Sequence, residues 1–321
     1  MKQPQWVRFG ELIPCRTAFI DAHTPGSSEK ENFTIIGGGV SESPDQHVHI
    51  TATPGFNIGA AGQPPRCFNS LHSHNTAEVF FVLKGRWRFF WGETGEDGEV
   101  VLQEGDIFNI PTRLFRGFEN IGSDYGMIMS ILGGDDAGGG VVWAPHVRKA
   151  AQIHGLVLGV TGRLYDTKQG ESLPDGEQEM PLPEKAWLET LLRPDATTVV
   201  KHFVARYWDM MAMATKSPVR VIGEQGLLVD KPGFDVDFIG RQSVGEKRLN
   251  AEKDVVLMIM RGHWAVSWQG RTEIFNPGDT VWLPQGTEYT LQVIVSGEAS
   301  LFRVTKTDDP AGLTWMENSH E

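Results

Sequence analysis

The sequence predicts a mainly β protein in which two antiparallel barrel domains are joined by a helical segment. Short runs of alternating apolar residues fill residues 46–132 and return from residue 219, and each run is bounded by Gly, Pro, Asn or Asp. The stretch between these regions has helical patterning instead. The 321 residues include 37 Gly and 18 Pro, which suits many short strands and leaves room for two domains of about 100–200 residues each.

Residues 1–45 are expected to form an irregular extension that wraps one of the barrels. Residues 22–31 are polar and rich in turn-forming types, and the three glycines at 37–39 cannot form a helix interior. The first barrel is expected over residues 46–132. Its short runs have the spacing typical of a sandwich or barrel: HVHITA, EVFFVL, RWRFFW, EVVL, DIFNIP and YGMIMSIL.

Residues 133–218 are expected to connect the barrels. The sequence GGDDAGGG at 133–140 predicts a flexible link. Helices are expected after it, over residues 145–159, 183–192 and 197–214. Pro145 supports the first of these, because proline is favoured at the first position of a helix.

The strand pattern returns at residues 219–306, which predict the second barrel, and residues 307–321 form a C-terminal tail. The two β regions share no obvious sequence repeat. Their glycines and prolines nevertheless recur at corresponding spacings, which predicts that the same fold is used twice.

Charge and apolar content exclude several classes of function. The chain has 41 acidic and 29 basic residues, a net charge of −12, so we expect no nucleic-acid partner. The longest clear apolar run, residues 255–260, is far shorter than the ~20 residues of a membrane span. The first residues lack an apolar signal core, and Cys15 and Cys67 cannot make a disulfide framework. We therefore expect a cytoplasmic protein with no membrane partner.

The segment LHSHNTAEVFFVLKG (71–85) carries the most informative candidate chemistry. His72 and His74 are two residues apart, so on a strand both imidazoles point to the same face, and Glu78 follows at an even spacing. Two imidazoles and one carboxylate can hold a first-row metal and leave positions open for oxygen or substrate. The alternative interpretation is a pair of surface histidines beside a surface acid.

These residues resemble the first sequence motif of the cupin superfamily, Gly-x5-His-x-His-x3–4-Glu-x6-Gly. His72, His74, Glu78 and Gly85 match its last four fixed positions, whereas its opening glycine is missing. The resemblance implies two cupin domains, each a double-stranded β-helix or jelly-roll barrel. It also implies a metal held by His72, His74 and Glu78.

The second cupin motif, Gly-x5-Pro-x-Gly-x2-His-x3-Asn, is matched by Gly105, Pro111 and Asn120. Arg113 replaces its second glycine, and Arg116 replaces the histidine that is the family's usual fourth ligand. An arginine is always protonated and cannot ligate a metal. Three interpretations remain open. Arg116 and Arg113 bind a substrate carboxylate beside a three-ligand metal, or Arg116 pairs with Glu78 in place of the metal, or Arg116 points outward.

The second β region resembles the cupin motifs without the ligands. Gly262 corresponds to Gly85, and the same spacing places Leu249, Ala251 and Val255 at the ligand positions. The second motif is matched by Gly278, Pro284 and Gly286, with Tyr289 at the histidine position. The second barrel is therefore expected to be a degenerate cupin without a metal.

The organisation resembles, distantly, bicupin dioxygenases that cleave the rings of gentisate or salicylate-like acids. This resemblance implies a non-haem iron dioxygenase that acts on a small carboxylic acid, with aromatic acids among the expected substrates. His72, His74 and Glu78 would bind iron(II), with manganese, nickel or zinc as alternative metals, and Arg116 and Arg113 would anchor the substrate. Because sheet edges in such barrels commonly pair, we also expect a homodimer.

Two other classes remain open on the same residues. The first is a metal-free bicupin that binds a small acid through Arg113 and Arg116 without catalysis. The second is a metal-dependent lyase, isomerase or decarboxylase. Metal content separates the first of these from the enzyme classes, since only the enzymes require a bound ion.

Overall fold

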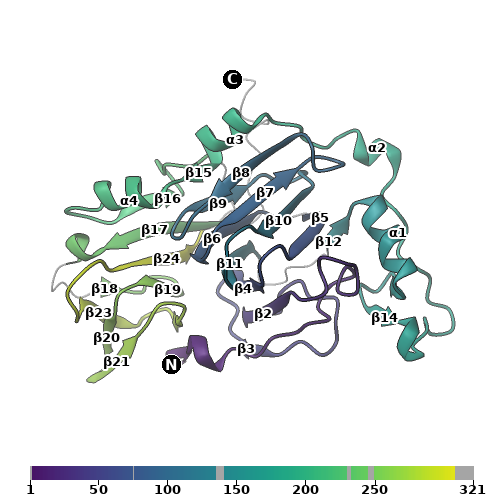
Figure 1. The fold of residues 1–321 in the computed structure, drawn as a ribbon. Helices are drawn as coiled ribbons and strands as arrows, with labels where there is room; N and C mark the ends of the chain where they lie inside the picture. Colours follow the sequence, from purple (N-terminus) through teal and green to yellow (C-terminus); the bar gives the residue numbers. More distant parts are fainter. Residues whose placement is uncertain (1, 75, 135–140, 230–232, 245–248, 308–321) are drawn as a thin grey trace.

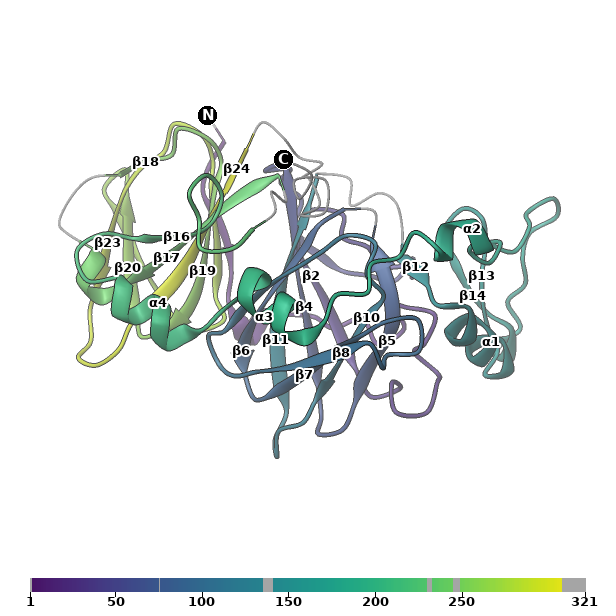
Figure 2. The same cartoon turned by 90° about the horizontal axis from the view of Figure 1, so that it is seen from above.

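The computed structural model describes residues 2–74, 76–134, 141–229, 233–244 and 249–307. Figure 1 shows a β-rich molecule, and Figure 2 shows its two barrels side by side with the helical segment along them. The fold therefore has the mainly β, two-barrel class that the sequence predicts. In the part of the chain covered by these ranges, no helix is long and apolar enough to cross a membrane.

The first barrel consists of two sheets that face each other. One sheet has the strand order β15-β9-β6-β11-β4-β2-β3, and the other has the order β12-β5-β10-β7-β8. The strands of the first sheet are β2 (Glu31–Ile36), β3 (Val48–Ile50), β4 (Phe56–Gln63), β6 (Glu78–Lys84), β9 (Ile107–Ile110), β11 (Gly126–Gly133) and β15 (Val204–Ala205). Those of the second are β5 (Phe68–His74), β7 (Trp87–Trp91), β8 (Gly98–Leu102), β10 (Arg116–Asn120) and β12 (Val141–Trp143).

The second barrel has the same two-sheet construction. Its sheets have the orders β1-β22-β19-β24-β17-β16 and β18-β23-β20-β21. The first sheet contains β1 (Gln5–Val7), β16 (Val219–Ile222), β17 (Phe234–Gly240), β19 (Val255–Arg261), β22 (Thr280–Leu283) and β24 (Ser300–Lys306). The second contains β18 (Leu249–Asn250), β20 (Trp264–Trp268), β21 (Arg271–Phe275) and β23 (Glu288–Val293).

Equivalent residues of the two barrels occupy equivalent places. His72 on β5 pairs with Arg116 on β10, and Leu249 on β18 pairs with Tyr289 on β23 in the same way. The indole Nε1 of Trp87 donates to the carbonyl of Lys84 at 3.0 Å, and that of Trp264 donates to the carbonyl of Arg261 at 3.0 Å. The two barrels thus repeat the same strand pairing at equivalent positions, as the glycine and proline spacing predicts.

A shared apolar core joins the barrels. It contains buried side chains from both of the larger sheets, with Phe81 packed against Phe302 at a ring-centroid distance of 4.7 Å and Phe56 against Phe234 at 5.7 Å. Aromatic pairs of this kind add packing energy to the burial of apolar area. The two sheets therefore form one continuous core.

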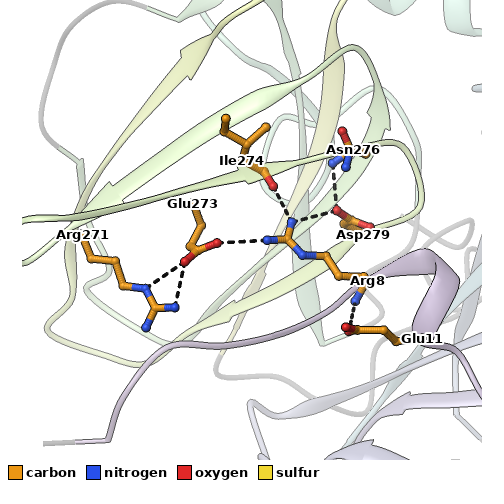
Figure 3. Close-up of polar contacts among 7 residues, drawn as sticks. All are labelled: Arg8, Glu11, Arg271, Glu273, Ile274, Asn276 and Asp279. Atoms are coloured by element: carbon orange, nitrogen blue, oxygen red, sulfur yellow. Dashed lines mark hydrogen bonds and ion pairs between the residues drawn. The ribbon is translucent and has the colours of Figure 1, made fainter.

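The N-terminal extension contacts both barrels, whereas the sequence suggested that it wraps one. β1 pairs with β22 of the second barrel, while β2 pairs with β4 of the first. Between them lies the 3-10 helix η1 (Phe9–Glu11). Figure 3 shows how Arg8 fixes this segment to the second barrel, through ion pairs of 3.1 Å each with Glu273 and Asp279.

The helical segment is more broken than expected. It contains α1 (Pro145–Ile153), β13 (Leu156–Leu158), β14 (Leu164–Asp166), η2 (Thr167–Gln169), α2 (Lys185–Leu188), α3 (Ala196–Phe203) and α4 (Tyr207–Met213); a further 3-10 helix, η3 (Arg241–Ser243), lies in the second barrel. The single helix predicted over 197–214 is divided because Val204 and Ala205 leave the helix to pair with Phe108 and Ile107 of β9. The predicted flexible link at 133–140 and tail at 307–321 lie outside the described residues, apart from residues 133, 134 and 307.

Candidate metal centre

Two strands of the first barrel bring three potential ligands together. His72 and His74 lie on β5, and Glu78 is the first residue of β6. Ligand atoms of these residues lie within 4.8 Å of one another, and each residue is at most 5% exposed. The even spacing therefore brings the three side chains to one point, and among the described residues they form the one such cluster of His, Cys, Asp or Glu found.

A backbone carbonyl orients the imidazole of His72. Its Nδ1 lies 2.7 Å from the carbonyl oxygen of Ser70, and since a carbonyl can only accept, Nδ1 carries the proton and Nε2 carries the lone pair. Burial, aided by the positive charge of Arg116, holds the pKa of His72 well below its ordinary value. The ring is thus neutral, as a metal ligand must be.

Aromatic rings support the same imidazole. The Trp143 ring on β12 lies 5.2 Å from that of His72, and the Phe118 ring on β10 lies 6.4 Å from it. The indole Nε1 of Trp143 donates to Glu42 at 2.6 Å. These contacts fix the plane of the His72 ring.

Arg116 points toward the cluster. Its guanidinium donates to the carboxylate of Glu78 and, through the other terminal nitrogen, to the carbonyl of His72 at 3.0 Å. Glu78 also lies 3.6 Å from Nε2 of His74. Burial raises the pKa of Glu78, and the charge of Arg116 opposes that rise. The sequence left three interpretations of Arg116 open, and the structure shows the one in which Arg116 pairs with Glu78.

The donor set fits a divalent metal. It supplies the Nε2 lone pair of a neutral imidazole whose proton is held by a backbone carbonyl, a second imidazole, and a carboxylate. The bond from Arg116 uses Oε2 of Glu78, so the other carboxylate oxygen remains for an ion. His72, His74 and Glu78 could therefore hold a first-row metal, whereas Arg116 supplies none of its ligands.

A cavity of about 60 Å³ opens beside these residues. Phe19, Phe80 and Trp143 form apolar parts of its wall, while Asn32 and Ser130 contribute polar groups. Of the described residues that line it, none is Lys or Arg. The second predicted anchor, Arg113, is not among them.

Arg113 has a clear backbone role. It stands where the cupin motif has glycine, and its φ of 58° is in the left-handed region that glycine adopts most readily. Gly286, the corresponding residue of the second barrel, has a φ of 84°. The turn has therefore kept its shape although the side chain changed.

Two charged residues beside this cluster were not identified from the sequence. Asp21 and Lys30 of the N-terminal extension are fully buried and form an ion pair with each other. They lie in a polar, turn-rich stretch that carries no metal motif. Only the fold reveals their proximity to His72, through Asn69 and Ser70.

Comparison with known proteins agrees with this architecture. The cupin domain family matches residues 62–132. The pyrimidine/purine nucleoside phosphorylase of Yersinia enterocolitica is 37% identical over 68 residues, which are 19% of this chain and 72% of that protein. The chain belongs to the cupin superfamily, and its two barrels make it a bicupin.

Solved structures share the fold at low sequence identity. Salicylate 1,2-dioxygenase from Pseudaminobacter salicylatoxidans has a TM-score of 0.53 and 15% identity, with 94% of this chain and 83% of that chain covered. Oxalate decarboxylase from Lactobacillus farciminis, in a formate complex, has a TM-score of 0.54 and 12% identity, with 99% and 89% covered. The similarity extends over both barrels and the segment between them.

Proposed function

We propose that this bicupin is a metal-dependent enzyme, a non-haem iron dioxygenase-like oxidoreductase that acts on a small carboxylic acid. The observation that carries the proposal is the convergence of His72, His74 and Glu78 beside a cavity in the first barrel. The similar folds of a dioxygenase and a decarboxylase support it. A divalent ion bound there would supply Lewis-acid and redox chemistry, with positions left open for oxygen and substrate.

The protein itself would position the reactants and exclude water. Phe19, Phe80 and Trp143 give the cavity an apolar wall that keeps bulk solvent from the candidate site. The cavity volume of about 60 Å³ is less than half of the ~150 Å³ at which an apolar cavity takes up benzene. This size favours an acid with few non-hydrogen atoms over an aromatic ring.

The two arginines enter the proposal with different roles. Arg116 keeps the carboxylate of Glu78 in place through its direct bond, and binds the carbonyl of His72 at the same time. Its expected role as a substrate anchor stays a prediction, as does that of Arg113. A homodimer and a cytoplasmic location are likewise predictions.

A second candidate is a metal-free bicupin that binds a small acid without catalysis. The buried bond between Arg116 and Glu78 favours it, because a guanidinium there already neutralises the carboxylate that a metal would need. In this function His72 and His74 would serve as hydrogen-bonding groups of a ligand pocket.

Metal content decides between the candidates. Elemental analysis of protein purified without added metal should show about one ion per chain for the enzyme and none for the binder. After anaerobic loading with iron(II), oxygen uptake should be measured with short 2-oxo and 2-hydroxy acids and with hydroxybenzoates. Oxygen uptake with one of these acids supports the dioxygenase. Bound metal with acid turnover but no oxygen uptake would indicate a decarboxylase, lyase or isomerase instead.

A further inference from the structure

We propose that Asp21 and Lys30, from the N-terminal extension, are positioning residues that set the orientation and the proton placement of His72. The inference rests on the proposed metal site for its consequence, the affinity for a metal. Its structural content concerns the apoprotein. The N-terminal extension would thus help to position a ligand of the first barrel, although the two are separate in sequence.

The two residues form a fully buried ion pair. Both side chains are 0% exposed, and Nζ of Lys30 donates to a carboxylate oxygen of Asp21. Nζ also donates to Oδ1 of Asn69 at 2.8 Å, and it lies 5.4 Å from the ring centroid of Phe19. Removing two charges from water costs several kcal/mol for each ion in a protein interior, so hydrophobic residues of similar volume would serve stability as well or better. The pair therefore calls for an explanation other than stability.

One connection to His72 passes through Asp21. The second carboxylate oxygen of Asp21 accepts a hydrogen bond from the backbone N–H of Ser70 at 3.0 Å. The carbonyl of the same residue, Ser70, accepts the Nδ1 proton of His72 at 2.7 Å. Asp21 thus fixes the peptide segment whose carbonyl decides which nitrogen of His72 carries the proton.

The other connection passes through Lys30. By donating to Oδ1 of Asn69, Lys30 fixes which way the amide of that side chain points. The amide nitrogen thereby lies 3.4 Å from Nδ1, a packing contact that limits where the ring can sit, because both nitrogens carry hydrogens and neither can accept. Asp21, Lys30, Asn69 and Ser70 together enclose the protonated edge of the imidazole. The opposite nitrogen, Nε2, keeps its lone pair, and ligand atoms of His72, His74 and Glu78 lie within 4.8 Å of one another.

The test combines a variant that removes the pair without leaving a buried charge with a control at another ion pair. Asp21→Leu/Lys30→Met removes both charges at similar volume, so the fold should be retained. Arg206→Met serves as the control, because it deprives buried Asp106 of its partner at 2.7 Å and neither residue lines the cavity. Nitrogen-15 shifts of the histidine side chains report the protonated nitrogen in metal-free protein, and calorimetry with Mn²⁺ reports affinity.

In wild type and Arg206→Met, His72 should be a single species protonated at Nδ1. In Asp21→Leu/Lys30→Met, the shifts should show a mixture of tautomers, and Mn²⁺ affinity should fall by about 10–100-fold. The variant should stay folded with a lower melting temperature, since the N–H of Ser70 and Oδ1 of Asn69 lose their partners. Unchanged His72 shifts in the double variant would overturn the inference. If wild type binds no Mn²⁺, the proposed metal site fails, and the His72 shifts alone still decide whether Asp21 and Lys30 position the ring.

Discussion

The guanidinium of Arg116 is bonded to the carboxylate of Glu78 inside the first barrel, with the side chains only 2% and 6% exposed. Arg116→Met removes the cation and leaves a buried carboxylate unpaired. We expect the metal-free variant to lose about 3–5 kcal/mol of unfolding free energy. Added Mn²⁺ should recover more stability in the variant than in wild type, because the ion replaces the lost charge. Urea denaturation with and without Mn²⁺ measures both effects.

A matched control is Arg88→Met, since Arg88 pairs with Glu119 at 2.7 Å but is 38% exposed. Such an exposed pair should contribute less than about 1 kcal/mol, and its loss should not depend on Mn²⁺. Equal losses in the two variants would argue against a special role for the Arg116–Glu78 bond.

His72→Ala should abolish metal binding, because it removes one of the three clustered ligands, an imidazole whose Nδ1 is bonded to the Ser70 carbonyl and whose Nε2 carries the lone pair. His263→Ala is the control: this histidine is exposed and bonded to Asn276 in the second barrel. Elemental analysis of both variants after loading should show a loss in the first alone. Wild-type metal content in His72→Ala would remove His72 from the proposed site.

Glu42 should make stability depend on pH. Burial raises its pKa from 4.5 to about 8, against the opposing effect of its bond to Trp143. The folded protein therefore binds a proton at Glu42 that the unfolded chain has released, and stability from this group is complete below pH ~4.5 and lost as pH rises to ~8. The total is on the order of a few kcal/mol.

Glu42→Gln removes this titration. Denaturation at pH 5, 6.5 and 8 should show the wild type with its largest advantage over the variant at pH 5 and a decreasing one toward pH 8. A difference that stays constant over this range would show that Glu42 has an ordinary pKa.

Asn120 is the asparagine of the second cupin motif, and we expect its role to be structural. Its fully buried amide donates to the carbonyls of Gln63 and Asp124 at 2.8 Å each, and its oxygen accepts from the N–H of Gly122 at 2.9 Å. Asn120→Ala should destabilise the fold by about 2–3 kcal/mol, since buried groups lose their partners. Metal content should be unchanged. A variant of full stability that has lost its metal would reverse this assignment.

The candidate ligands could be predicted because their relationship is local. Side chains alternate along a strand, so the spacing of His72 and His74 fixes their common face, and Glu78 follows four residues after His74. The turn glycines and prolines likewise revealed the second barrel, in which Val255 begins β19 as Glu78 begins β6. Such short-range rules hold without knowledge of the whole fold.

The partner of Arg116 could not be settled in the same way. Three orientations of its side chain were consistent with strand parity, and only burial and the position of Glu78 select one. Asp21 and Lys30 are separated from His72 by dozens of residues, and no motif links them. The break at Val204 has a similar cause, because pairing with β9 outweighs local helix propensity.

The extension is anchored by Arg8 on the second barrel, and the same segment of chain places Asp21 and Lys30 behind His72 in the first. A fragment made of residues 46–132 would retain all three candidate ligands and the complete cupin match region from residue 62 onward. It would nevertheless lack Asp21 and Lys30, to which we assign the positioning of Ser70, Asn69 and hence His72. Recombination or trimming at that boundary should therefore transfer the recognisable motif with a weakened metal affinity, so a portable metal site needs a longer segment than the family motif.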